Sequence, residues 1–286
     1  MTVRIVTDST ADIPREVRER LRIEMVPLKV LFGQASYLDA VDLDADSFYA
    51  KLAEAPSLPT TSQPSPTEFS EVYERILRED PGASIISIHL ASVLSGTYQS
   101  AVLAASMIEE EADITVYDSK SASYGIGTVV VAAAEMAAAG RSKEEILAEI
   151  EEIHNRLRLY FLVDTLEYLQ KGGRIGKASA VLGSLLNIKP ILSLDRDGGV
   201  MAVDKVRGQK KAIQRIVDLL RQDYEGKAVD VTMAWTTSRD TADQLLEQLR
   251  PHFDIRKVHY TTIGAVIGTH VGPGTSAVFM NGARET

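Results

Sequence analysis

Short apolar runs alternate with amphipathic segments through the first half of the chain. Residues 3–6, 84–90 and 114–117 are mostly apolar and rich in β-branched side chains, which predicts buried strands. A helix is predicted between the first two because apolar side chains recur at the spacing of one helix face, at Phe69, Val72, Tyr73, Ile76 and Leu77. Strands that alternate with helices at this spacing predict a largely parallel, Rossmann-like sheet.

The pattern changes near residue 158. A strand is predicted over residues 159–163, and residues 188–194 and 200–206 flank a glycine-rich turn, as in a β-hairpin. Further strands are predicted over three later segments, at residues 229–235, 255–260 and 277–280. We therefore expect an α/β fold of two α/β domains: residues 1–157 with the mostly parallel sheet, and residues 158–286 with a mixed sheet.

Composition narrows the class of protein. The net charge of −9 is spread along the 286 residues, so no basic footprint for nucleic acid is expected. The chain has no cysteine, which excludes disulfides, thiolate metal sites and a cysteine nucleophile. Its first residues read as a strand and not as a signal peptide, and the longest weakly polar run, residues 126–139, is too short to span a bilayer. We expect a soluble, cytoplasmic protein.

Residues 59–66 form a proline-rich segment with uncharged polar side chains, among them the hydroxyls of Thr61 and Ser62. It leads directly into a helix, since Ser65 and Glu68 have the spacing of a capping box. A stiff, hydroxyl-rich loop at a helix N-terminus can hold an anion or a carboxylate. The alternative interpretation is a proline-stiffened surface linker.

Two further polar turns follow predicted strands. Ser95, Gly96 and Thr97 come after a buried strand and open a helix, which places two hydroxyls and free backbone N–H groups at its N-terminus. Residues 7–12 follow the first strand, at the sheet edge where ligands gather in open α/β folds. The alternative for both turns is helix capping, by Ser95 or Thr97 in one and by Asp12 in the other.

His270 lies in a stretch with four glycines, where the backbone can approach a ligand closely. An imidazole there can donate a hydrogen bond to a carboxylate whether it is neutral or charged. The alternative is a partly buried structural histidine. The other four histidines have no metal-ligand spacing and are interpreted as incidental: His89, His154, His252 and His259.

The common catalytic signatures are absent. No G-x-S-x-G surrounds Ser95 and no H-E-x-x-H occurs. Residues 172–178 resemble a P-loop only faintly, because the spacing differs and Ala178 replaces the magnesium-binding hydroxyl. We therefore expect no nucleotide site. A hydrolase with Ser95 as nucleophile, His270 as base and Asp8 or Asp12 as the orienting group remains the enzymatic alternative.

Six segments, taken in order, resemble the DegV family of bacterial fatty-acid-binding proteins. They cover essentially the whole chain: Val6-Thr7-Asp8-Ser9-Thr10-Ala11-Asp12, Thr61-Ser62-Gln63-Pro64-Ser65, Leu94-Ser95-Gly96-Thr97-Tyr98-Gln99-Ser100-Ala101, Lys171-Gly172-Gly173-Arg174-Ile175, Lys205-Val206-Arg207-Gly208 and Thr269-His270-Val271-Gly272-Pro273-Gly274.

The resemblance implies a fatty acid, such as palmitate, stearate or oleate, in a tunnel near the junction of the two domains. Its carboxylate would be bound by hydroxyls at Thr61 or Ser62 and at Ser95, with His270 close by. The full expected ligand set is Thr61, Ser62, Ser95, Gly96, Thr97 and His270. Arg174 and Arg207 are expected to contact either a partner or the ligand.

The resemblance also implies a carrier without catalytic residues, cofactor or metal. It would present the acid to a separate fatty-acid kinase, which forms an acyl-phosphate for phospholipid synthesis. A transient contact with a membrane surface is compatible with this role. A lipid-sensing regulator with the same pocket is the other alternative, and it differs from the carrier only in its partner.

Overall fold

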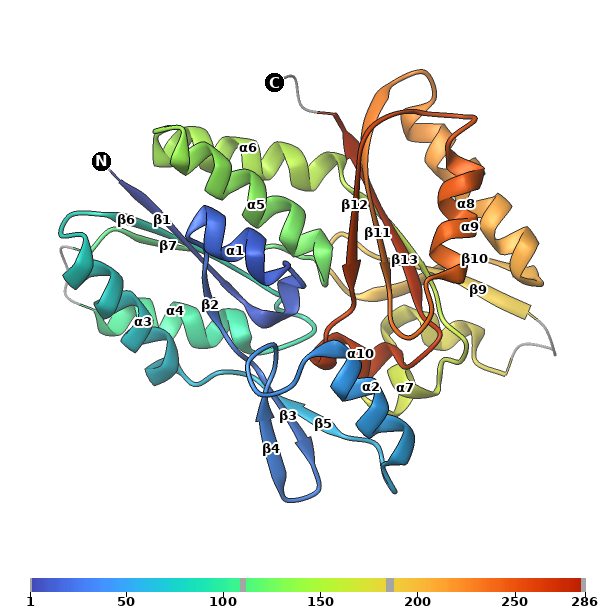
Figure 1. The fold of residues 1–286 in the computed structure, drawn as a ribbon, viewed down its shortest axis with the longest axis horizontal. Coiled ribbons are helices and arrows are strands. Elements are labelled where there is room, and N and C mark those ends of the chain that lie inside the picture. The colour runs from blue at the N-terminus through green and yellow to red at the C-terminus, as the bar shows by residue number, and fades with distance from the viewer. Residues whose placement is uncertain (1, 109–111, 184–187, 284–286) are drawn as a thin grey trace.

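A four-stranded parallel sheet forms the centre of the N-terminal half (Figure 1). The computed structural model describes residues 2–108, 112–183 and 188–283. The strand order is β2-β1-β6-β7, and all neighbours run parallel. The strands are β1 (Val3–Asp8), β2 (Glu24–Val26), β6 (Ser84–His89) and β7 (Ile114–Asp118). The predicted parallel sheet is confirmed.

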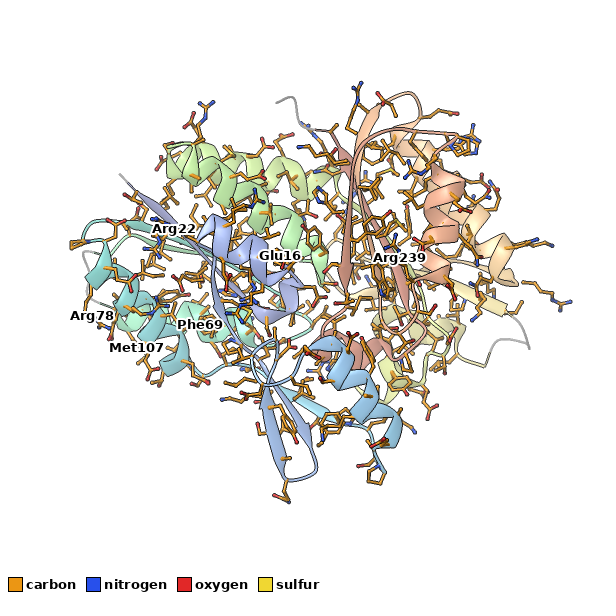
Figure 2. All side chains as sticks on the ribbon, in the orientation of Figure 1. Glu16, Arg22, Phe69, Arg78, Met107 and Arg239 are labelled. Carbon is orange, nitrogen blue, oxygen red and sulfur yellow. The ribbon has the colours of Figure 1, made fainter. Side chains whose placement is uncertain are left out.

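Helices cover both faces of this sheet. Figure 1 shows α3 and α4 on one side and α5 and α6 on the other. Phe69 projects from α3 into a core with Val6 and Ile85 of the sheet (Figure 2). The helices are α1 (Arg15–Leu21), α3 (Pro66–Glu79), α4 (Thr97–Met107), α5 (Tyr124–Ala138) and α6 (Lys143–Arg156), with a 3-10 turn, η1 (Ser9–Ala11), after β1.

The C-terminal half has a six-stranded mixed sheet in the order β10-β9-β8-β13-β11-β12. Only β11 and β12 pair in parallel; the other neighbours are antiparallel. The strands are β8 (Arg158–Leu162), β9 (Ile188–Leu194), β10 (Val200–Arg207), β11 (Ala228–Trp235), β12 (Asp254–Thr262) and β13 (Ser276–Gly282). Strands β9 and β10 form the predicted hairpin.

One face of the mixed sheet packs on α8 (Gln209–Tyr224) and α9 (Asp240–Leu249). Its other face shares a continuous core with the N-terminal half, since Phe161 and Phe279 cluster with Ile88 and Val130. The boundary at residue 157 lies between α6 and β8 and stays a prediction. No helix in the described part of the chain is long and apolar enough to cross a membrane.

A third, small sheet has the strand order β4-β3-β5 and lies at the bottom of the view in Figure 1. Its elements are β3 (Lys29–Phe32), β4 (Ala35–Leu38) and β5 (Thr60–Ser62), and α2 (Ala45–Glu54) packs beside it. The interpretation of residues 59–66 as a loop throughout was therefore wrong, because residues 60–62 pair with β3. The capping box at Ser65 and Glu68 is present as predicted.

The short elements α7 (Glu167–Lys171), η2 (Gly176–Val181) and α10 (Ala265–Val271) complete the fold. Helix α10 was not predicted, because its glycine-rich sequence read as a loop. It packs on α2 and α7 and carries His270.

Candidate functional site

A cavity of about 420 Å³ lies where the two halves of the chain meet. Its walls come from the mixed sheet, from β5, from α10 and from the segments that follow β6 and β7. Most of the lining is apolar: Leu28, Leu90, Leu94, Ala122, Leu159, Phe161, Leu169, Leu194, Val200, Ile263, Val266, Ile267, Val271, Ala277 and Phe279. A cavity of this kind suits a long apolar ligand.

Polar side chains gather at one end of the cavity. Thr61 of β5 and His270 of α10 lie in contact, with 2.9 Å between Thr61 Oγ1 and His270 Nε2. Ser95 lines the same cavity, and Arg174 is held beside it because its Nε donates to the carbonyl of Leu94 (3.1 Å). Four side chains that are distant in sequence thus form one polar cluster.

His270 is neutral in this cluster. Burial, and secondarily the charge of Arg174, lower the pKa of His270 to about 4. Its Nδ1 atom is buried and has no hydrogen-bond partner among the described residues, so a proton on Nδ1 would be an unsatisfied donor. We therefore place the proton on Nε2, which donates to Thr61 Oγ1 and leaves the Thr61 hydroxyl free to donate into the cavity.

Glycines allow the close packing around the polar cluster. A Cβ on Gly172 would lie 2.3 Å from His270 Nδ1, so any larger residue would push the imidazole away from Thr61. A Cβ on Gly96 would lie 2.4 Å from the Gln63 side chain, so Gly96 lets the segment after β5 pack against the N-terminus of α4. The close packing at Gly172 and Gly96 therefore helps to hold the polar side chains of the cluster in place.

The remaining predicted site residues lie around this end without all lining the cavity. Ser62 is exposed at the cavity wall and donates to the carbonyl of Gln63 at 3.4 Å. Thr97 is buried behind Ser95, with 2.9 Å between their hydroxyl oxygens. Gly96 is the N-cap residue of α4, and its contact is with Gln63. Neither Gly96 nor Thr97 is part of the cavity lining.

Carboxylates from the N-terminal half cap helix α10. Asp12 Oδ1 accepts a hydrogen bond from the backbone N–H of Gly264 (2.9 Å), and Asp39 Oδ1 accepts one from Ala265 (3.3 Å). Asp12 Oδ2 also accepts from Ser123 Oγ (2.5 Å), and Ser123 is itself a lining residue. Asp12 therefore joins two walls of the cavity, and the alternative interpretation, in which it caps the helix beginning at Arg15, was wrong.

These two carboxyl groups have shifted pKa values. Burial raises the pKa of Asp39 to about 6. Burial also raises the pKa of Asp12 well above its ordinary value, and the nearby charge of Asp39 adds to the shift. Asp39, one of the two residues that anchor α10, therefore titrates in mildly acidic solution.

Comparison with known proteins decides the family. The model of a family described as "Uncharacterised protein, DegV family" matches residues 2–282. The chain belongs to the DegV family. Protein DegV of Bacillus subtilis is 39% identical over 280 residues, which cover 97% of this chain and 98% of the relative.

Solved structures of DegV proteins share the whole fold. "Fatty Acid Binding of a DegV family Protein from Thermus thermophilus" matches with a TM-score of 0.92 and 38% identity, covering 99% of this chain and 100% of that chain. "Crystal Structure of DegV, a fatty acid binding protein from Bacillus subtilis" matches with a TM-score of 0.87 and 39% identity, with the same coverage. The predicted family and fold class are confirmed.

Sequence reasoning missed a buried polar network in this DegV protein. His89, interpreted as incidental, lies with Nδ1 3.0 Å from Asp8 Oδ2 and Nε2 2.6 Å from Ser87 Oγ, and Tyr73 donates to Ser87. All four side chains are fully buried. The signal was Ser87 and His89 on alternate positions of an apolar strand, which places both on one face.

The same contacts argue against the hydrolase alternative. Asp8 is engaged by His89, and Asp12 is engaged by Ser123 and Gly264. Ser95 contacts Thr97, whereas His270 contacts Thr61. The hydrogen bonds among the described residues thus do not assemble Ser95, His270 and an aspartate into a triad.

Arg207 does not line the cavity. It is exposed on β10, which is an edge strand of the mixed sheet, and it is not part of the cavity wall. Arg174, in contrast, lines the cavity while remaining exposed. The two arginines grouped together by sequence therefore occupy different environments.

Proposed function

We propose that this protein binds a long-chain fatty acid in the cavity, with the carboxylate at the cluster of Thr61, Ser95, Arg174 and His270. The observation that carries the proposal is the apolar cavity with hydroxyls, one neutral imidazole and one guanidinium clustered in its wall. A buried carboxylate must be hydrogen-bonded, and these groups can donate to it. The fatty-acid-binding DegV structures from Thermus thermophilus and Bacillus subtilis support the assignment.

The acyl chain supplies most of the binding free energy in this proposal. Burying about fifteen methylenes at roughly 0.8 kcal/mol each gives on the order of 12 kcal/mol before the costs of association. The polar cluster then selects the head group and fixes its direction. Thr61 makes the main contact rather than Ser62, because Thr61 is half-buried and its proton is free to donate, whereas Ser62 is exposed.

The bound acid is presented to a separate fatty-acid kinase, which forms the acyl-phosphate used in phospholipid synthesis. Arg174 at the exposed rim of the polar end is placed to contact both the carboxylate and an incoming phosphoryl group. Arg207 faces solvent on an edge strand, and we assign it to the contact with the kinase. In this scheme the protein itself catalyses no reaction.

Two measurements test the two parts of the proposal. Calorimetric titration with oleic acid and methyl oleate should give tighter binding of the acid. Incubation with ATP and a bacterial fatty-acid kinase should give acyl-phosphate only when both proteins are present.

Arg207→Ala should keep oleate affinity and reduce kinase-dependent turnover, while Arg250→Ala, at another exposed arginine, should change neither. Failure to bind oleate would overturn the binding assignment. Normal binding without kinase-dependent product, or ATP hydrolysis by the isolated chain, would overturn the carrier role alone.

A further inference from the structure

The far end of the cavity is closed by a row of apolar side chains across three strands. Phe279 of β13 pairs with Leu159 of β8 in the antiparallel register. Phe161 of β8 pairs with Leu192 of β9, and two residues further along the same register Leu159 lies opposite Leu194. Because alternate residues share a face, Leu159, Leu194 and Phe279 form one row on the cavity side of the sheet.

This row lies opposite the polar end. Thr275 just precedes β13 and donates to the carbonyl of Val271, the residue after His270. From Thr275 to Phe279 the chain advances four residues, which is about 13 Å in a strand. Strand β13 therefore runs along the cavity from the polar cluster to the row that contains Leu159.

A second cleft begins immediately behind the row. It has a volume of about 620 Å³, and its charged lining includes Lys120, Arg158 and Arg196 together with Glu151 and Asp195. Leu159 and Leu194 line both this cleft and the apolar cavity. Both side chains are half-buried, so a partition one side chain thick separates the tail end of the cavity from an open, charged cleft.

We propose that Leu159 and Leu194 form the partition that sets the longest acyl chain the site accepts. This inference rests on the proposed fatty-acid binding and names its specificity-determining pair. Each methylene buried on the cavity side of the row gains about fourfold in affinity, whereas a chain that reaches the row must displace a leucine or fold back. Affinity should rise with chain length up to the row and then stop rising.

The test is a chain-length series on matched variants. Palmitate, stearate, arachidate and behenate are titrated against the wild type, Leu159→Ala, Leu194→Ala and the double variant. Opening the partition should raise the ratio of arachidate to palmitate affinity by about tenfold or more. Leu169→Ala removes the same atoms from a lining residue of α7, which packs against α10, and should leave that ratio unchanged.

Two additional arms keep the test decisive. Leu194→Phe enlarges the partition and should shift the preference towards shorter acids, which covers the case in which an alanine variant fails to fold. A dicarboxylic acid as long as arachidate should bind the open variants better than the wild type, because its second carboxylate can then reach the charged cleft. An unchanged length ranking in every folded variant would overturn the partition, whereas no binding of any acid, wild type included, would overturn the proposed function.

Discussion

Replacing Thr61 with valine removes one hydroxyl from the polar end and nearly preserves the shape of the side chain. Two losses follow from the geometry. Without Thr61 Oγ1, the Nε2–H of His270 has no acceptor in the ligand-free site, which should cost about 1–3 kcal/mol of unfolding free energy. The fatty acid also loses a charge-assisted hydrogen bond, about 1.5–3 kcal/mol, which is roughly ten- to hundredfold in affinity.

The assay separates the head group from the chain. Each variant is titrated with oleic acid and with methyl oleate, which carries the same chain without the charge. Thr61→Val should weaken binding of the acid tenfold or more and barely affect the ester, so the preference for acid should shrink. Ser95→Ala should behave similarly, because Ser95 lines the same end.

Ser62→Ala is the matched control for this prediction. Its hydroxyl is exposed and has only a long hydrogen bond to a carbonyl, so its loss should change acid binding severalfold at most. Equal losses for acid and ester in Thr61→Val would contradict carboxylate binding by Thr61, since the hydroxyl would then shape the fold without contacting the carboxylate. A larger loss of acid affinity in Ser62→Ala than in Thr61→Val would show that Ser62, and not Thr61, makes the main contact with the carboxylate.

Two further predictions follow from the surroundings of His270. Gly172→Ala should displace the imidazole and weaken oleate binding about tenfold, as measured by titration. Gly282→Ala is the control and should not change binding, because its Cβ would lie 3.9 Å from the nearest atom, Cε1 of Tyr224. The pH profile of unfolding should separate two groups. Asp39 contributes stability below pH 3.8 that is lost as the pH rises through about 6, so Asp39→Asn should remove that decline, on the order of 3 kcal/mol. His270 contributes stability above pH 6.5 that is lost as the pH falls towards 4. His270→Gln should therefore lack this loss of stability at acidic pH. Profiles of both variants parallel to the wild type in denaturant melts would contradict these shifts.

Local signals in the sequence predicted most of the regular elements. The capping box of Ser65 and Glu68 and the apolar stripe behind it identify α3, because both depend only on neighbouring residues. Helix α10 was missed because Gly268 lies inside this short helix and Gly264 and Gly272 bound it, so the segment has the composition of a glycine-rich loop. It forms because its first N–H groups are capped by carboxylates from the other half of the chain, and no local pattern reveals such caps.

The sequence predicted which kinds of residue form the candidate site, but it did not predict which of them contact one another. Thr61 and His270 are separated by 209 residues, so only the family resemblance linked them before the fold was known. The polar turn after β1 was one candidate wall of the site, yet Asp8 and Asp12 are engaged within the fold, by His89 in one case and by Ser123 and Gly264 in the other. Short polar turns beyond strands do not reveal whether their side chains face a ligand or hold neighbouring segments in place.

The most direct test of fatty-acid binding is native mass spectrometry of the protein purified from bacterial cells, followed by organic extraction. We expect an adduct with the mass of a long-chain fatty acid, released on denaturation and recovered in the extract, without any acid having been added. A homogeneous lipid-free protein that also takes up neither palmitate nor oleate on incubation would contradict it.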